Sequence, residues 1–418
     1  MIGNLCHGMH LREYKMKRSV STAILMTASA LWCSAALAIG QSAPSPAGSA
    51  RVTGIAKFVD GLIASGDVSG AVTLVARDGR IVHLQAQGVT DLVSRKPMQK
   101  DTLMRIASMT KPVVAVAVLM LVEEGKIRLD DPVSRFIPAF KSVQVAVPRG
   151  QGYYSVPVDR PLTITDLLTH TGGLVSGPIS IAAATKVMDR HRAEGIKALE
   201  DLAAVPLEFQ PGTRWSYSGL AGFELLARIV EIAAGQRFGE FAQQRIFTPL
   251  GMKDTTFWPT DAQRARMATL YVQGDKGITP NTDPDRLNTP MLDSGGGGLI
   301  TTIESYARFA MLLANGGEYD GVRLLAPATV RLMGSPVVAD SLPGRQPGEG
   351  YGLGVRVVAN PVARHVLLGP GSYGWSGAYG THFWIDPSRK LVAILFVQTP
   401  GQARTGDFET AVMQSVAD

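Results

Sequence analysis

The chain has 418 residues, and its 41 Lys and Arg against 35 Asp and Glu give a formal net charge of +6. Beyond the N-terminal segment no cluster of basic side chains remains, so the charge pattern argues against a nucleic-acid-binding protein. The two cysteines, Cys6 and Cys33, both lie in that segment. We therefore expect no disulfide, no thiolate nucleophile and no cysteine-based metal site in the rest of the chain.

Residues 1–38 have the pattern of a secretory signal peptide. Basic residues precede an apolar run from Val20 to Leu37, which ends in the small-x-small sequence Ala-Leu-Ala at residues 36–38. We expect cleavage after Ala38 and a periplasmic or secreted protein without a membrane anchor. A membrane-anchoring helix is the alternative, but the run is short for one and is diluted by Ser and Thr. Cleavage would remove four basic residues and one acidic residue, and would lower the net charge from +6 to +3.

The next segments alternate between helical and strand patterns. Residues 39–50 are expected to form a flexible leader, and residues 51–65 have the apolar spacing of a helix. Two β-rich runs joined by Asp78-Gly79 predict a hairpin. From Val113 to Val122 every residue is apolar, and a glycine follows shortly after. This pattern predicts a buried helix that ends near that glycine.

The second half of the chain turns from helical to β-rich. Residues 126–290 alternate short helical patterns with loops, whereas three strand-like segments follow the glycine-rich sequence SGGGG. Strands at both ends predict an α+β fold: one antiparallel β-sheet flanked by helices, with an inserted helical lobe. We expect residues 51–105 and 300–418 to form the α/β domain, and residues 106–299 to form the mainly helical lobe.

Ser108 and Lys111 are the first candidates for chemistry. A hydroxyl becomes a good nucleophile only when a base takes its proton. Residues three apart share one face at a helix start, so the Lys111 amine can reach the Ser108 hydroxyl. The positive end of the helix dipole favours an anion there and a neutral lysine. A serine N-cap followed by a solvated lysine gives the same short pattern. The pair alone therefore does not show whether Ser108 and Lys111 are catalytic.

Three further stretches add candidates, each with a structural alternative. Tyr217 lies in a loop before a helix, where a tyrosine beside a positive lysine can serve as a base or can simply pack. Residues 375–378 begin a strand whose small side chains would let a substrate lie along its edge, beside a backbone N–H directed at a carbonyl oxygen. A core strand would look similar. His170 is interpreted as a structural hydrogen-bonding residue, because no second ligand lies at metal-binding spacing.

The order of these motifs resembles the serine β-lactamase and penicillin-binding-protein superfamily. The resemblance is to its class C β-lactamase-like branch, and most closely to the family VIII carboxylesterases. It implies a β-lactamase/transpeptidase-like fold. No Gly-x-Ser-x-Gly motif of the α/β-hydrolases occurs. The matching segments span nearly all of residues 39–418 and are RIASMTKP, GKIRLDDPV, LLTHTGGL, PGTRWSYS, PLGMKDTTF, SGGGGLITT, YGLGV and GWSGAYGTHFWIDP.

The resemblance implies a role for each motif residue. Ser108 would be the acylated nucleophile and Lys111 its proton acceptor. Tyr217 would share the role of base, protonate the leaving group and activate the deacylating water. The backbone N–H groups of Ser108 and Ala378 would form the oxyanion hole. No metal or organic cofactor is implied.

Two motifs depart from the β-lactamase pattern. Tyr-x-Asn is replaced by Tyr-Ser-Gly, so that Gly219 stands where an amide would bind the side-chain carbonyl of a β-lactam. Lys-Thr-Gly is replaced by Trp375-Ser376-Gly377, so that an aromatic ring stands where a lysine would meet the β-lactam carboxylate. We expect these four residues to contact the substrate. Both changes suit a neutral ester better than an anionic amide.

The sequence therefore predicts an exported serine hydrolase that cleaves short-acyl carboxylic esters through an acyl-enzyme on Ser108. A β-lactamase or a D-amino-acid peptidase is the first alternative. An inactive penicillin-recognising binding protein is the second, and the presence of Ser108, Lys111 and Tyr217 together argues against it. The expected partner is a small-molecule ester or amide substrate, and no nucleic acid is expected.

Overall fold

The computed structural model describes residues 46–194, 196–275, 277–285, 292–338, 341–401 and 403–416. The expected signal peptide, its cleavage site and both cysteines lie outside these residues. Helix α1 (Pro46–Ala64) begins five residues before the start at Arg51 that the sequence indicates. Within the described ranges, no helix combines the length and the apolar character that a membrane span needs.

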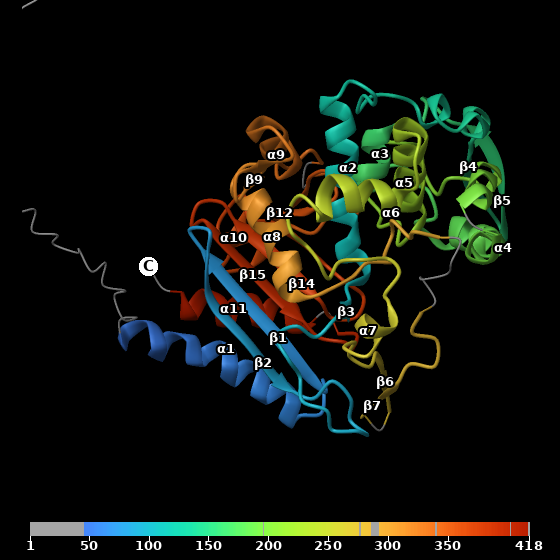
Figure 1. Cartoon of the computed structure of the whole chain (residues 1–418). Coiled ribbons are helices and arrows are strands. Elements are labelled where there is room, and N and C mark those ends of the chain that lie inside the picture. Colours follow the sequence, from blue (N-terminus) through green and yellow to red (C-terminus); the bar gives the residue numbers. More distant parts are fainter. Residues whose placement is uncertain are drawn as a thin grey trace, which may run out of the picture. The chain divides into compact units, whose positions relative to one another are not determined.

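A seven-stranded antiparallel sheet forms the centre of the molecule, in the order β11-β12-β13-β14-β15-β1-β2 (Figure 1). Strand β1 pairs with β15, with Val72 opposite Phe396, so the two ends of the chain meet inside one sheet. The predicted fold class is therefore confirmed. The strands are β1 (Gly70–Arg77), β2 (Arg80–Gly88), β11 (Glu349–Tyr351), β12 (Arg356–Val358), β13 (Tyr373–Ser376), β14 (His382–Asp386) and β15 (Leu391–Phe396).

The turn between β1 and β2 is the one that the sequence predicts. Asp78 and Gly79 both have positive φ, at 50° and 73°. Two successive residues in this region give the tight turn whose twist matches a two-stranded ribbon. The hairpin places β1 inside the sheet and β2 at its edge.

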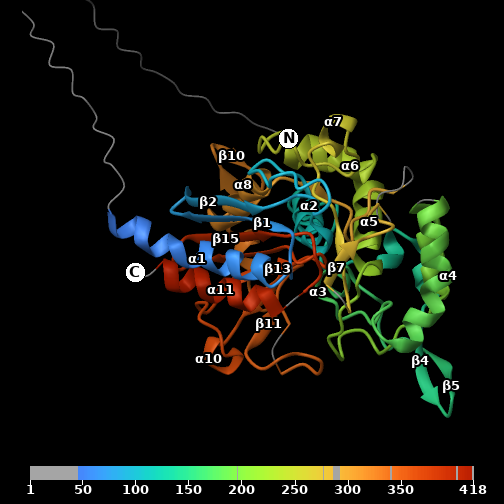
Figure 2. The same cartoon turned by 90° about the horizontal axis from the view of Figure 1, so that it is seen from below.

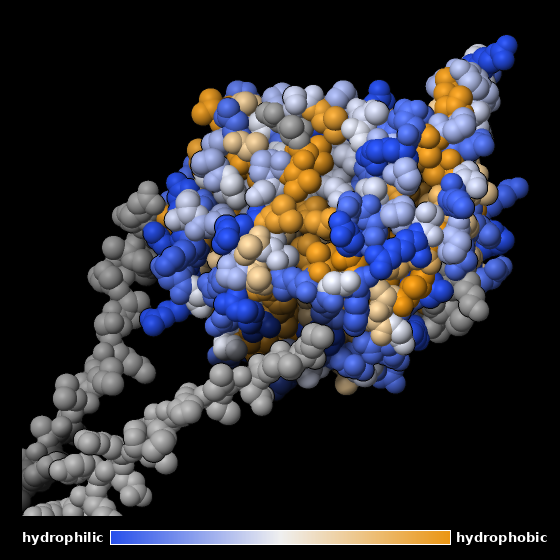
Figure 3. Space-filling model, turned by 90° about the horizontal axis from the view of Figure 1, so that it is seen from above, coloured by the Kyte–Doolittle hydropathy of each residue, from blue (hydrophilic) through white to orange (hydrophobic). Residues whose placement is uncertain are grey.

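Helices cover both faces of the sheet (Figure 2). Helices α1 and α11 (Ala403–Ser415) lie side by side on one face, where Ile55 and Phe408 pack with Trp384 of β14. Helix α8 (Ile303–Ala314) covers the other face, and its Tyr306 lies against the ring of Phe396. Seen from above, the surface carries an uneven band of hydrophobic residues between hydrophilic margins (Figure 3).

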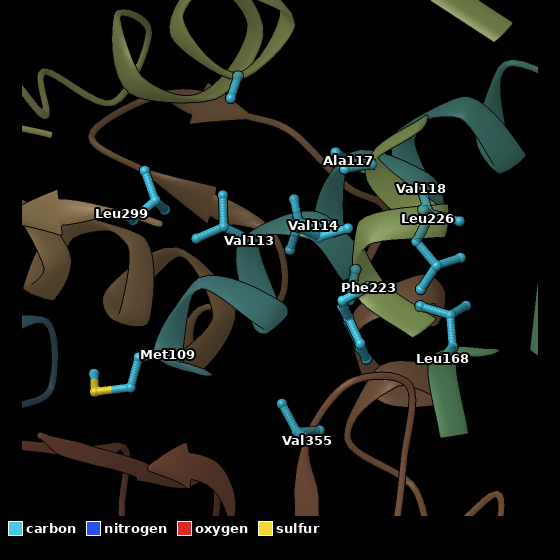
Figure 4. Close-up of a cluster of buried hydrophobic side chains, with 14 of the residues drawn as sticks. Met109, Val113, Val114, Ala117, Val118, Leu168, Phe223, Leu226, Leu299 and Val355 are labelled. Atoms are coloured by element: carbon cyan, nitrogen blue, oxygen red, sulfur yellow. The ribbon is translucent and has the colours of Figure 1, made fainter. Parts of the chain in front are cut away.

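Helix α2 (Lys111–Glu123) is the centre of the helical region. Every residue from Lys111 to Leu121 is buried, and Gly125 follows with φ of 71°, which confirms the predicted buried helix and its stop. Val114 and Val118 of α2 lie beside Phe223 and Leu226 of α5 (Ala221–Ala234) (Figure 4). The apolar run of α2 therefore has partners on all sides, as a helix without a polar face requires.

The remaining elements frame the sheet and α2. One hydrophobic cluster joins sheet residues such as Ile394 to Val113 and Phe223 of the helical region, so the two-part division drawn from the sequence stays a prediction.

The other helices are η1 (Ala107–Thr110), η2 (Val133–Arg135), η3 (Pro138–Ser142), α3 (Ile164–Thr169), α4 (Pro178–Glu194), η4 (Ile196–Ala204), α5 (Ala221–Ala234), α6 (Phe238–Ala242), η5 (Gln243–Phe247), α7 (Asp261–Arg264), α9 (Pro327–Met333) and α10 (Pro361–Arg364). The short strands pair as β3 (Met104–Arg105) with β8 (Ile300–Thr301), β4 (Gln144–Arg149) with β5 (Gly152–Pro157), β6 (Tyr271–Gly274) with β7 (Gly277–Pro280), and β9 (Glu318–Tyr319) with β10 (Val322–Arg323).

The core packing yields a stability prediction. Phe396 is fully buried between the sheet and α8. Replacing it with alanine leaves a cavity, and we expect Phe396→Ala to lower the free energy of unfolding by about 3–5 kcal/mol. The control is Val93→Ala, because the Val93 side chain is 86% exposed. Urea denaturation of both variants tests this, and equal stability would contradict the packing described.

Candidate active site

Ser108 lies in the short turn η1 that leads into α2. Ala107, just before it, has φ of 44°, a left-handed conformation that costs a non-glycine residue on the order of 1–3 kcal/mol. The turn is tied down, because the Thr110 hydroxyl donates to the Ala107 carbonyl at 2.7 Å and accepts the Leu299 N–H at 3.1 Å. The strained turn presents the Ser108 hydroxyl at the wall of a cavity.

Lys111 and Tyr217 converge on that hydroxyl. The buried Lys111 Nζ lies 3.1 Å from Ser108 Oγ, and the Tyr217 hydroxyl donates to the same oxygen at 2.8 Å. Lys111 Nζ also donates to the carbonyls of Gly219 at 2.6 Å and Gly296 at 2.7 Å. Two carbonyls therefore fix the amine, and its remaining position faces Ser108. The structure brings together the three residues that the sequence singles out.

A buried carboxylate positions one of the carbonyls that hold Lys111. Glu224 of α5 accepts hydrogen bonds from the Ser294 hydroxyl and from the N–H groups of Gly295 and Gly296. The glycines are required, because a Cβ at Gly295 would lie 2.6 Å from the Phe223 carbonyl oxygen. Sequence reasoning missed Glu224. The available signal was an acidic residue within the apolar face of a helix.

Tyr217 is held in an aromatic cluster around His170. The ring centroid of His170 lies 4.7 Å from that of Tyr217, and the Trp375 ring lies 5.4 Å from Tyr217. His170 Nδ1 accepts the Ser218 N–H at 3.3 Å, which agrees with its interpretation as a structural residue. Burial, and then the positive charges of Lys111 and Arg345, lower the pKa of His170 well below its ordinary value. The imidazole is therefore neutral and supports the loop that carries Tyr217.

Residues 375–378 lie at the end of strand β13, rather than at the beginning of a strand as the sequence predicts, and they meet the turn η1. A Cβ at Gly377 would lie 2.2 Å from the Ile106 carbonyl oxygen, so only glycine allows this approach. The Thr381 hydroxyl donates to the same carbonyl at 3.1 Å, and its own carbonyl accepts the Gly377 N–H at 2.7 Å. Within the described ranges the Ala378 N–H has no hydrogen-bond acceptor. Ala378 lines the same cavity as Ser108, whose own N–H lies at a helix start.

A cavity of about 380 Å³ opens over Ser108. Predicted substrate contacts divide into two groups: Trp375 and Ser376 line this cavity, whereas Gly219 binds Lys111 and Gly377 packs against Ile106. The full lining is Ser108, Trp215, Tyr217, Gly344, Gln346, Glu349, Arg356, Arg364, Trp375, Ser376 and Ala378. Five of these lining residues lie outside every motif that the sequence singles out: Gly344, Gln346, Glu349, Arg356 and Arg364.

The two cavity arginines are each paired with a carboxylate. Arg364 Nε lies 3.2 Å from Glu349, and Arg356 Nη2 lies 2.8 Å from Glu409. Both guanidinium groups are therefore already paired, and neither is an unpaired cation that could bind an anionic substrate. Across the described residues, no group of three or more His, Cys, Asp or Glu side chains is arranged to hold a metal ion.

The glycine packing around Lys111 yields a second prediction. Gly295→Ala forces a methyl group against the Phe223 carbonyl, and we expect a loss of about 1–3 kcal/mol in the free energy of unfolding. Gly219→Ala is the matched control, because a Cβ there meets nothing within 4 Å. Calorimetric melting temperatures compare the two. A Gly295→Ala variant as stable as Gly219→Ala would contradict the close approach of Gly295 to the Phe223 carbonyl.

Comparison with known proteins shows which family and which proteins this chain is similar to. The chain matches the family model described as Beta-lactamase over residues 55–418. It is 37% identical to Protein Rv1367c of Mycobacterium tuberculosis, covering 80% of this chain and 86% of that protein. It is 33% identical to Esterase EstB of Burkholderia gladioli, covering 83% and 90% of the two chains.

Solved structures share the fold. The hydrolase EstCE1, described as having promiscuous acyltransferase activity, matches with a TM-score of 0.77 and 25% identity, over 89% of this chain and all of the other. Unliganded simvastatin synthase from Aspergillus terreus matches with a TM-score of 0.72 and 23% identity, over 87% of this chain and 99% of the other, which supports the fold alone. With its family model spanning most of the chain, this protein belongs to the β-lactamase family, a family of serine hydrolases.

Proposed function

We propose that the protein is an exported carboxylesterase that forms an acyl-enzyme on Ser108 and prefers short acyl groups. The observation that carries the proposal is the Tyr217–Ser108–Lys111 arrangement, in which two potential bases contact one hydroxyl at the wall of a cavity. Export to the periplasm or the medium is inferred from the pattern of residues 1–38.

Acylation uses each member of this arrangement. Ser108 Oγ attacks the ester carbonyl carbon while its proton passes to Lys111, whose remaining position faces that oxygen. The N–H groups of Ser108 and Ala378 stabilise the carbonyl oxygen as it becomes an anion. Tyr217 gives a proton to the departing alcohol and regains one from Lys111. The carbonyl–alcohol bond breaks, and the acyl group remains on Ser108.

Deacylation runs the same steps with water. Water attacks the acyl carbonyl and passes a proton to Tyr217 as Tyr217 passes its own proton to Lys111, and Lys111 then returns a proton to Ser108 Oγ as the acid leaves. The same oxyanion hole serves both acylation and deacylation, because the carbonyl oxygen occupies one position in both steps. Every proton needed is supplied by Tyr217, Lys111 and the water itself.

The cavity supports a neutral ester rather than an anionic amide. Trp215, Tyr217 and Trp375 give it aromatic walls, and both of its arginines are paired with carboxylates. A charged substrate group would have to displace one of these pairs. The 33%-identical relative EstB is named an esterase, which agrees with this choice. A β-lactamase or D-amino-acid peptidase activity is the less favoured alternative.

Kinetics on matched substrates tests the proposal. We expect purified protein to cleave p-nitrophenyl esters at rates that fall with acyl length, with little turnover of a chromogenic cephalosporin. Ser108→Ala should lose at least about 10³-fold in kcat, because the nucleophile is gone. Ser376→Ala should reduce the rate far less. If Ser376→Ala lost more activity than Ser108→Ala, the assignment of Ser108 as the nucleophile would be wrong.

A second variant tests the reason for ester preference. Gly219→Asn adds an amide that can bond a β-lactam side-chain carbonyl, and the open space at Gly219 admits it. We expect cephalosporin kcat/KM to rise about fivefold, the value of one neutral hydrogen bond, relative to Gly219→Ala. Equal cephalosporin rates in both variants would show that the missing amide does not set this preference.

A further inference from the structure

Ser376 belongs to a chain of polar side chains that the proposed mechanism does not use. Ser376 Oγ lies 2.8 Å from His382 Nδ1, and His382 Nε2 lies 3.0 Å from Glu409 Oε1. Arg356 Nη2 donates to the same carboxylate oxygen at 2.8 Å. The four residues come from β13, β14, α11 and β12. Only Ser376 and Arg356 reach the cavity, whereas His382 and Glu409 are buried behind it.

The carboxylate at the buried end fixes where the imidazole proton lies. Burial raises the pKa of Glu409, but the hydrogen bond from His382 and the interaction with Arg356 bring it down to about 2. An ionised carboxylate can only accept hydrogen bonds, so the proton between Glu409 and His382 must stay on Nε2. Arg356 supplies the positive charge that balances Glu409.

The direction of the Ser376 hydroxyl follows from this tautomer. In a neutral imidazole with its proton on Nε2, Nδ1 is a hydrogen-bond acceptor. When His382 is uncharged, Ser376 donates its proton to His382 Nδ1, and the oxygen lone pairs of Ser376 remain for the cavity. A serine without such a partner could turn its hydroxyl either way. The contact with His382 therefore fixes the direction of the Ser376 hydroxyl, and the Ser376 oxygen faces the cavity as a hydrogen-bond acceptor.

The position of Ser376 limits which part of a substrate it can meet. Ala378, whose N–H is available for the ester carbonyl, is two residues further along the chain. Two residues span at most about 7 Å. A group that bonds to Ser376 therefore lies only a few bonds from the scissile ester. Simple alkyl esters offer no hydrogen-bond donor at that distance, whereas a hydroxyl on a short chain does.

We propose that the Ser376–His382–Glu409–Arg356 chain makes Ser376 a specificity-determining hydrogen-bond acceptor, and that the preferred substrates are short esters with a hydroxyl group close to the ester bond. His382 and Glu409 act as positioning residues through Ser376. This inference rests on the proposed esterase function, because it assigns the class of ester that the same cavity takes.

Two substrate pairs test the inference, one on each side of the ester. On the acyl side, p-nitrophenyl 3-hydroxybutyrate is compared with 3-methylbutyrate; on the alcohol side, 2-hydroxyethyl butyrate is compared with propyl butyrate. Each pair exchanges a hydroxyl for a methyl group of similar size. The readout is the ratio of kcat/KM within a pair at pH 8, where imidazole side chains are ordinarily neutral.

Ser376→Thr and Ser376→Val are the matched variants, since they differ only in a hydroxyl against a methyl group. We expect the wild-type protein and Ser376→Thr to favour the hydroxyl substrate in at least one pair. That ratio should exceed the ratio of Ser376→Val about fivefold. Glu409→Gln, if folded by its melting curve, should move the ratio toward that of Ser376→Val. Equal ratios for Thr and Val variants in both pairs would overturn the inference.

The test separates this inference from the proposed function. Turnover that survives Ser108→Ala would refute the proposed mechanism, whereas Ser108-dependent turnover with unaltered ratios would refute only the role of Ser376. Calorimetric titration of Ser108→Ala with the intact esters gives the same comparison as dissociation constants, without any turnover. A hydroxyl preference in binding that Ser376→Val abolishes supports the inference, and its absence overturns it.

Discussion

The site depends on the burial of one amine. Lys111 is fully buried, and an amine removed from water is tolerated only when its hydrogen-bonding positions are filled. The carbonyls of Gly219 and Gly296 fill two of them, and Ser108 takes the third. These partners come from three separate segments of the chain. The same contacts that stabilise the buried amine therefore assemble the site.

Each segment is shaped so that it can reach Lys111. Glu224 draws the loop at residues 294–298 inward, and the glycines of that loop permit its close approach to α5. His170 holds the segment that carries Tyr217. Gly377 lets β13 meet the turn before Ser108. The proposed nucleophile, its bases and the proposed oxyanion hole thus lie where a buried helix, two loops and the end of strand β13 meet.

Local patterns predicted the features that depend on local physics. Asp78-Gly79 encodes its turn through positive φ, and the apolar run from Val113 to Val122 can only be buried. The motif spacing also indicated that Ser108 and Lys111 would meet. The resemblance to a known superfamily supplied Tyr217 as their partner.

Other features depend on residues that are distant in the sequence and carry no periodic signal. Glu224 accepts hydrogen bonds from a loop about seventy residues away, and Glu409 of α11 contacts His382 on the face of the sheet that α11 covers. Nothing near Glu409 in the sequence indicates that it is buried rather than solvated, and the only signal for Glu224 is its place on the apolar face of a helix. The cavity walls at Arg356 and Arg364 are likewise set by tertiary packing. The proposed nucleophile could be found from the sequence, whereas the residues that surround it in the cavity could be found only from the structure.

Trapping the acyl group on the protein would show directly whether Ser108 is the residue that becomes acylated. The protein would be mixed with a p-nitrophenyl ester, quenched in acid during turnover and analysed by intact-mass and peptide mass spectrometry. We expect a mass increase equal to one acyl group, located on the peptide that contains Ser108 and absent from Ser108→Ala. Rapid hydrolysis without any adduct, or an adduct on another residue such as Ser376, would contradict it.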